Sequence, residues 1–169
     1  MAIPFKKFVV AEALGIAAFN AGINASYTWW LWRSRDPLTL FGENAIAFDL
    51  ASTPVWIAVL STLLGTVLIR RKLRDGRVVA PKMLAPVILD TLPYGIVLRA
   101  TALGAVSAIV LGWPLWLMLQ ASAVGTLSLA AAVLMKVTIT VPLSLLIVPP
   151  VILTALADVQ RPRRVSAIA

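Results

Sequence analysis

The stretch that decides the fold runs from Ala100 to Met135 and reads ATALGAVSAIVLGWPLWLMLQASAVGTLSLAAAVLM, 36 residues without a charge. A helix needs about 20 apolar residues to cross the hydrocarbon core of a membrane, so this stretch is too long for one crossing. It is also short for two, and both helices must extend beyond it. The weakly polar segment QASAVGTLS, from Gln120 to Ser128, suits a turn between them. We therefore predict two membrane spans, at about residues 95–119 and 129–156.

Two further apolar runs precede this stretch and predict two more spans, at about residues 8–32 and 46–69. The first run is too long for the core of a secretory signal peptide and carries Glu12, so we expect it to be retained as a helix. The chain of 169 residues is 60% apolar and only 13% charged, whereas soluble domains are about a quarter charged. The sequence thus predicts an all-α integral membrane protein, a single membrane domain of four transmembrane helices. Prolines inside the spans predict kinks at Pro54, Pro142 and Pro149.

The distribution of lysine and arginine predicts the orientation of the spans. Eleven of these residues flank one side, in the N-terminal segment, a loop over residues 70–94 and a tail over residues 157–169, and two, Arg33 and Arg35, flank the other. The positive-inside rule then places both termini and the basic loop in the cytoplasm, in a membrane of the bacterial inner-membrane type. Tryptophans at the outer ends of the first and third spans fit an interfacial belt better than a ligand-stacking site.

The same positive charge limits the partners that the sequence predicts. The net charge of +8 is largely the topological signal, so we expect no nucleic-acid partner. The bilayer itself is the expected partner, and anionic lipid headgroups could bind the loop segment Arg70–Arg77. Small residues recur every fourth position in the first and third spans, which lets helix backbones approach closely in lipid. They could serve the bundle, or a homo-oligomer or larger membrane complex.

The two halves of the chain resemble each other weakly. AEALG at residues 11–15 matches ATALG at residues 100–104 with an offset of 89, and Pro54 matches Pro142 with an offset of 88. Both halves cross in the same order, so a repeat would be parallel, with its two-fold axis along the membrane normal. Chance similarity between apolar sequences is the alternative.

Each predicted span contains one ionisable side chain: Glu12, Asp49, Arg99 and Lys136. Counting along the spans places Glu12 and Arg99 near the cytoplasmic ends and Asp49 and Lys136 near the outer ends. Charges in lipid normally face inward and pair, so we predict a Glu12–Arg99 pair and an Asp49–Lys136 pair between the halves. Such pairs could fix helix register, the long cations could instead reach an interface, or the pairs could flank a solute pathway.

The space between the two charged levels also carries polar groups. Asn20 and Asn24 lie four residues apart in the middle of the first span and share one helix face. Carboxamides at this depth can hydrogen-bond between helices, or they can coordinate a permeating solute.

The absence of histidine and cysteine excludes thiolate nucleophiles, imidazole bases and the usual zinc and haem ligands. We therefore expect neither an enzyme nor a bound cofactor or metal. The sequence favours a transporter or channel for an ion or small solute, with a polar bundle interior. The alternative is a non-catalytic scaffold or accessory subunit that binds a partner protein or lipid.

Overall fold

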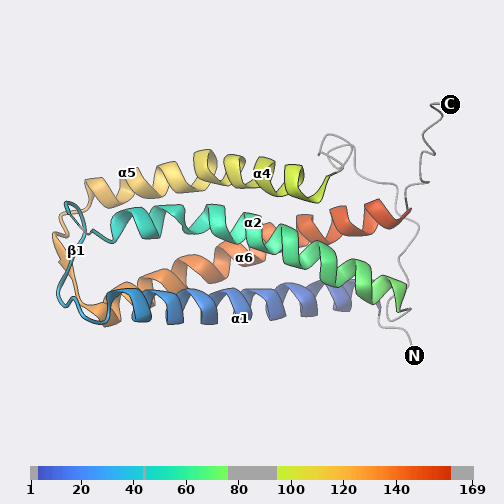
Figure 1. Ribbon diagram of the computed structural model, residues 1–169, viewed down its shortest axis with the longest axis horizontal. Helices are drawn as coiled ribbons and strands as arrows, with labels where there is room; N and C mark the ends of the chain where they lie inside the picture. Colours follow the sequence, from blue (N-terminus) through green and yellow to red (C-terminus); the bar gives the residue numbers. More distant parts are fainter. Residues whose placement is uncertain (1–3, 44, 76–94, 161–169) are drawn as a thin grey trace.

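The computed structural model describes residues 4–43, 45–75 and 95–160 of the chain (Figure 1). These residues form the long helices α1 (Phe5–Trp32), α2 (Ala47–Arg74) and α6 (Leu129–Gln160). A fourth helical rod consists of α4 (Ile96–Ser107), a short π-helical segment η1 (Ala108–Gly112) and α5 (Trp113–Ala121). Four helices in this described part are long and apolar enough to cross a membrane, as predicted. Helices are expected because a backbone in hydrocarbon must satisfy its own hydrogen bonds.

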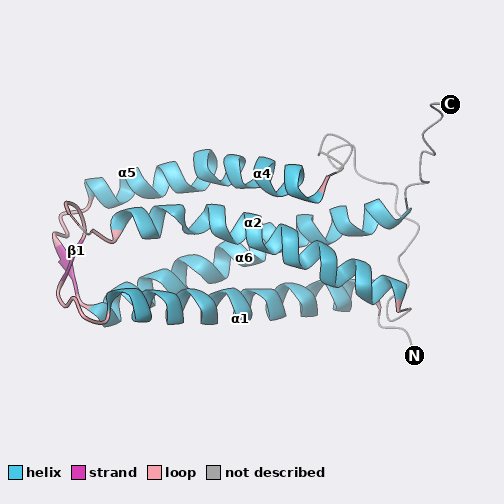
Figure 2. Cartoon of the chain, in the orientation of Figure 1, coloured by secondary structure: helices cyan, strands magenta, loops and turns pink. Residues whose placement is uncertain are grey.

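The four rods run side by side, with α2 and α6 at the centre of the bundle. Helix α1 packs on α6, α6 packs on α2, and α2 packs on the rod formed by α4, η1 and α5. Helices α1 and α2 touch each other very little. Apart from a short strand pair, Figure 2 shows only helices and their connections in the described residues. The first helix of each half therefore packs on the second helix of the other half.

The strand pair lies at one end of the bundle, which we call the loop end (Figure 1). Strand β1 (Leu38–Thr39) follows α1, and β2 (Thr126–Leu127) precedes α6. The strands are antiparallel, with Leu38 opposite Leu127 and Thr39 opposite Thr126. Helix α1 begins and α6 ends at the opposite end, which we call the terminal end.

Apolar side chains close the bundle at both ends. At the loop end a buried cluster joins the strands to the helices and includes Trp32, Leu38, Leu40, Ile46 and Leu119. At the terminal end a second buried cluster lies between α1, α2 and α6 and includes Phe8, Ile69, Val148, Ile152 and Leu156. Polar side chains are buried between these two apolar layers.

The helices differ from the predicted spans mainly at the terminal end. Helix α2 continues past Ile69 to Arg74, and α6 continues past Leu156 to Gln160. Lysine and arginine favour helix and are stabilised near a helix C-terminus, so the basic residues after Ile69 extend α2 although they cannot enter lipid. The rest of the predicted loop, residues 76–94, and the tail from residue 161 lie outside the described residues.

The π-helical segment η1 was not predicted. Its last residue, Gly112, lies where an added Cβ would come within 2.8 Å of the Ala51 carbonyl oxygen. Glycine therefore allows the rod formed by α4, η1 and α5 to approach the α2 backbone at this level. Pro54 and Pro142 lie inside α2 and α6, and Pro149 and Pro150 lie inside α6.

Candidate functional site

The ion pair predicted near the outer ends of the second and fourth spans is present. Lys136 Nζ lies 2.7 Å from Asp49 Oδ1 and donates a second hydrogen bond, of 2.9 Å, to the Asp49 carbonyl oxygen. Lys136 is only 2% exposed, so its ammonium is enclosed by the bundle. The predicted Asp49–Lys136 pair is thus confirmed, and it joins the two central helices near the loop end.

The two asparagines lie deeper in the bundle and use their amides differently. Asn20 is buried, and its Nδ2 donates to Ser144 Oγ at 3.0 Å and to Ser61 Oγ at 3.2 Å. Asn20 therefore links α1 to α2 and α6. Asn24 Nδ2 donates to the Asn20 carbonyl oxygen at 2.9 Å, a bond within α1. That bond fixes the Asn24 carboxamide and leaves its Oδ1 available as an acceptor.

A cavity of about 320 Å³ lies between α1 and α2, with α6 behind it. Four of the six predicted site residues line it, namely Asn20, Asn24, Asp49 and Lys136. Its other lining residues are apolar or aromatic: Phe19, Ile23, Tyr27, Trp56, Ile57, Leu60 and Leu64.

The cavity opens sideways. Six of its lining residues are exposed on the outer surface of α1 and α2, namely Phe19, Ile23, Tyr27, Trp56, Leu60 and Leu64. Both ends of the bundle are closed by the apolar clusters described above, whereas α1 and α2 barely touch. The rim therefore faces the surroundings of the bundle rather than its ends.

A stripe of buried polar side chains on α6 begins at the cavity with Lys136. Lys136, Thr140 and Ser144 follow one another at four-residue spacing on α6, and all three are buried. Asp49 Oδ2 and Thr140 Oγ1 are buried without a hydrogen-bond partner among the described residues. A buried polar atom without a partner costs about 1–3 kcal/mol, and of these two residues Asp49 is the one that lines the cavity.

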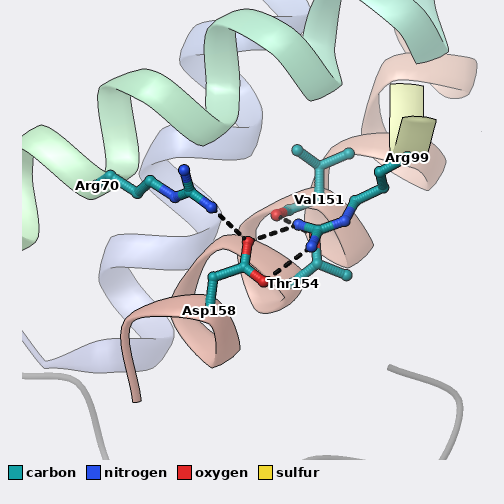
Figure 3. A network of polar contacts seen from close by, with 5 residues as sticks. All are labelled: Arg70, Arg99, Val151, Thr154 and Asp158. Atoms are coloured by element: carbon teal, nitrogen blue, oxygen red, sulfur yellow. Dashed lines mark hydrogen bonds and ion pairs between the residues drawn. The ribbon is translucent and has the colours of Figure 1, made fainter. Parts of the chain in front are cut away.

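The prediction of a Glu12–Arg99 pair near the cytoplasmic ends is wrong. Arg99 Nη1 and Nη2 instead donate to the two oxygens of Asp158, each at 2.8 Å (Figure 3). Lys72 Nζ donates to Glu12 Oε1. The reason is the packing order: α1 lies on α6 and α4 lies on α2, so the helices that carry Glu12 and Arg99 are not neighbours. Neither residue lines the cavity.

Asp158 is the residue that the sequence analysis missed. Arg70 Nη2 also donates to Asp158 Oδ2, at 2.9 Å, so two guanidinium groups converge on one carboxylate (Figure 3). Asp158 lies 22 residues after Lys136, one membrane crossing further on, at the level where Arg99 was placed. Its assignment to the tail after residue 156 hid this signal. Arg70, predicted as part of a lipid-binding segment, is held by this ion pair.

The arginines set the ionisation of Asp158, which lies just beyond the span that ends at Leu156. Burial of the carboxyl acts to raise its pKa, but the hydrogen bonds from Arg99 and Arg70 and their charges outweigh burial. The pKa of Asp158 therefore lies below its usual value of 3.8. The carboxylate remains charged and bound to both arginines at neutral pH.

A second hollow, of about 620 Å³, lies on the other side of α2 and is almost entirely apolar. It is walled by α2, η1 and α5, and its lining residues include Phe48, Val55, Trp56, Trp113 and Trp116. Ser52 is its polar contribution. This hollow has the character of a contact surface for apolar chains rather than of a chemical site.

The described residues therefore bring together a mainly apolar cavity that holds oxygen acceptors and one enclosed ammonium, and a separate cluster of charges at the terminal end. Comparisons with protein-family models, with curated proteins and with solved structures found no match to this chain.

Proposed function

We propose that the protein is a small membrane transporter or channel that carries an ion or small solute, with the cavity between α1 and α2 as its binding site. The observation that carries the proposal is the convergence of Asn20, Asn24, Asp49 and Lys136 on one cavity. Its volume is at the lower end of the range of about 300–1,000 Å³ that is typical of small-molecule sites. Ionisable groups inside membrane spans commonly mark such pathways.

A route for the solute beyond the cavity would follow buried hydroxyl groups of α2. Ser61 contacts Asn20. The next residue is Thr62, and Thr62, Thr66 and Arg70 follow one another at intervals of four residues along α2. Arg70 belongs to the Arg70–Asp158–Arg99 cluster. We propose that this cluster, with the apolar layer beside it, forms the closed gate of the pathway at the terminal end.

We infer that the terminal end faces the cytoplasm, because the basic flanks predict it. The chain has no native cysteine, so single cysteines report the orientation. With Glu43→Cys, a membrane-impermeant maleimide added to intact cells should label the protein. With Asp75→Cys, labelling should require permeabilised cells. Labelling of both variants from the same side would contradict the orientation.

We also propose that the chain is a parallel repeat of two helices. In the strand pair, Leu38 lies opposite Leu127 and Thr39 lies opposite Thr126. Leu38 and Thr126 are 88 residues apart, and so are Thr39 and Leu127. The strand register therefore has the same offset of 88 residues that relates Pro54 to Pro142. The packing order has the same symmetry, since each half contributes one central and one outer helix. Matching bends at Pro54 and Pro142 are expected on this basis.

Homo-oligomer formation and membership of a larger complex stay predictions. The small-residue ladders lend them no support, because Ala13 and Ala17 are buried in the packing of the bundle, as are Ala100 and Gly104. The apolar hollow beside Trp113 favours the second candidate function, a scaffold that binds a partner or lipid.

Reconstitution into liposomes distinguishes the two functions. The purified protein is tested with a panel of monovalent and divalent ions, amines, sugars and amino acids, and empty liposomes serve as the reference. Transport predicts protein-dependent flux of at least one class of solute. Flux equal to that of empty liposomes for the whole panel, from protein shown to be folded, would contradict transport and favour the scaffold.

A further inference from the structure

We propose that the ligand of the cavity is an amphiphile with a primary ammonium head and one long apolar chain, which enters sideways between α1 and α2. This inference rests on the proposed function in one respect: it names the solute class for the same cavity. It is tested by binding, which does not require transport.

The cavity and the hollow next to it, which together we call the groove, change in polarity along their length in the way that such a ligand requires. Asp49 and Lys136 lie at the loop end, close to the start of α2. In the other direction the cavity adjoins a hollow of about 350 Å³ that shares Phe19 and Asn20 with it and extends along α2 to Leu68. The groove thus carries charges at the loop end, Asn20 and Ser61 further along, and apolar side chains toward the terminal end.

The length of the groove suits a single hydrocarbon chain. From Asp49 to Leu68 is 19 residues of α2, which corresponds to about 28 Å at a rise of about 1.5 Å per residue. The exposed rim of the groove lets a ligand of this length pass between α1 and α2 without opening either end of the bundle. A fully polar solute would leave the apolar half of the groove without matching contacts.

The polar end of the groove has oxygen acceptors that are without hydrogen-bond partners among the described residues. Neither Asp49 Oδ2 nor Asn24 Oδ1 has a hydrogen-bond partner among the described residues, where the Asn24 side chain bonds through its Nδ2 alone. Asp49 and Lys136 both line the cavity, but the Lys136 ammonium is enclosed and is already bound twice by Asp49, whereas Asp49 Oδ2 is left for a further donor. The rings of Tyr27 and Trp56 line the same space and can attract a cation by their faces. These features select an ammonium over an anionic head.

Equilibrium binding to the intact protein in phosphatidylcholine nanodiscs tests this selection. The probe is radiolabelled dodecylammonium, and empty nanodiscs supply the background from partitioning into lipid. We expect the radiolabelled probe to bind saturably. Unlabelled dodecylammonium should displace the bound probe at a concentration at least tenfold lower than either dodecyl sulfate or butylammonium requires. Equal displacement by dodecyl sulfate would show that the head is not selected, and equal displacement by butylammonium would show that the chain is not.

Three variants test whether dodecylammonium binds in this groove. Asn24→Leu should weaken dodecylammonium binding at least tenfold and leave the fold intact, because within the described part of the chain the Asn24 amide bonds only to its own helix. The double variant Asp49→Asn/Lys136→Met removes both charges together and should also weaken binding. Trp113→Ala, in the other hollow, is the control and should bind as the original chain does. Unchanged binding in folded Asn24→Leu would overturn the assignment.

The experiments can contradict the transport proposal and the ligand proposal independently of each other. Selective dodecylammonium binding without flux of any solute would overturn transport but not the ligand class. Flux of another solute by protein that does not bind dodecylammonium selectively would overturn the ligand class alone.

Discussion

Arg70 and Asp158 lie 88 residues apart in the sequence, and the Arg70 guanidinium donates to the Asp158 carboxylate at 2.9 Å. The same offset separates Pro54 from Pro142, so Arg70 and Asp158 occupy equivalent positions in the two halves of the proposed repeat. Two equivalent positions can contact each other only beside the two-fold axis that relates the halves. The Arg70–Asp158 contact therefore places the axis of the proposed repeat between the central helices α2 and α6. Within each half, the charge of the first helix binds the second helix: Glu12 with Lys72, and Arg99 with Asp158.

Double-mutant cycles should separate the observed pairs from the pair that the sequence predicted. Removing one partner of a buried pair costs about 3–5 kcal/mol, because the other charge is left buried. Arg99→Gln combined with Asp158→Asn should therefore cost clearly less than the sum of the two single changes, measured by denaturant unfolding in detergent. Glu12→Gln combined with Arg99→Gln should be additive within about 0.5 kcal/mol, since these residues do not meet. Strong coupling between Glu12 and Arg99 would contradict the packing order.

Acid should weaken the protein through Asp158. Its pKa is lower in the folded chain than the usual 3.8, so the folded state stabilises the charged carboxylate. This contribution is complete above about pH 4–5, and it is lost as the pH falls below 3.8 toward the lowered folded pKa. Melting temperatures of the original chain and of Asp158→Asn, measured from pH 7 to pH 2.5, should therefore converge at low pH. A difference that stays constant over this range would show that ionised Asp158 does not provide the stability.

Close packing at η1 predicts a contrast between two glycines. Gly112→Ala should destabilise the protein by about 1–3 kcal/mol, because the new methyl group would meet a backbone oxygen of Ala51 that cannot rotate away. Gly22→Ala is the matched control, since nothing lies within 4 Å of a Cβ added there. It should be neutral or slightly stabilising, because alanine favours helix over glycine. Equal melting temperatures for the two variants would contradict the close approach of η1 to α2.

The sequence predicted the four helices and the Asp49–Lys136 pair because both follow from rules that act along one helix. Hydrophobic length sets each span, and counting from its ends gives the depth of each charge. The same counting failed for Glu12 and Arg99, because depth does not say which helices are neighbours. Neighbours are set by packing between helices, where small residues such as Gly104 and Gly112 meet α2.

The candidate site was predictable in its residue types but not in its shape. The common face of Asn20 and Asn24 followed from their four-residue spacing, and the cavity contains both. Its sideways opening depends on α1 and α2 lying apart with α6 behind them, which no local pattern of the sequence encodes. Asp158 was missed because it was assigned to the tail after residue 156, and its two arginine partners lie on two other helices.

The role of the cavity as a transport site is tested by the flux of a transported solute through folded Asn24→Leu protein in liposomes. Asn24 lines the cavity and makes no side-chain bond to another helix among the described residues, so its loss should spare the fold. Gln120→Leu removes an exposed carboxamide at the end of α5 and serves as the control. We predict that Asn24→Leu lowers flux at least tenfold with an unchanged melting temperature, while Gln120→Leu carries the solute normally. Flux through Asn24→Leu equal to that of the original chain would contradict the claim that this cavity is the transport site.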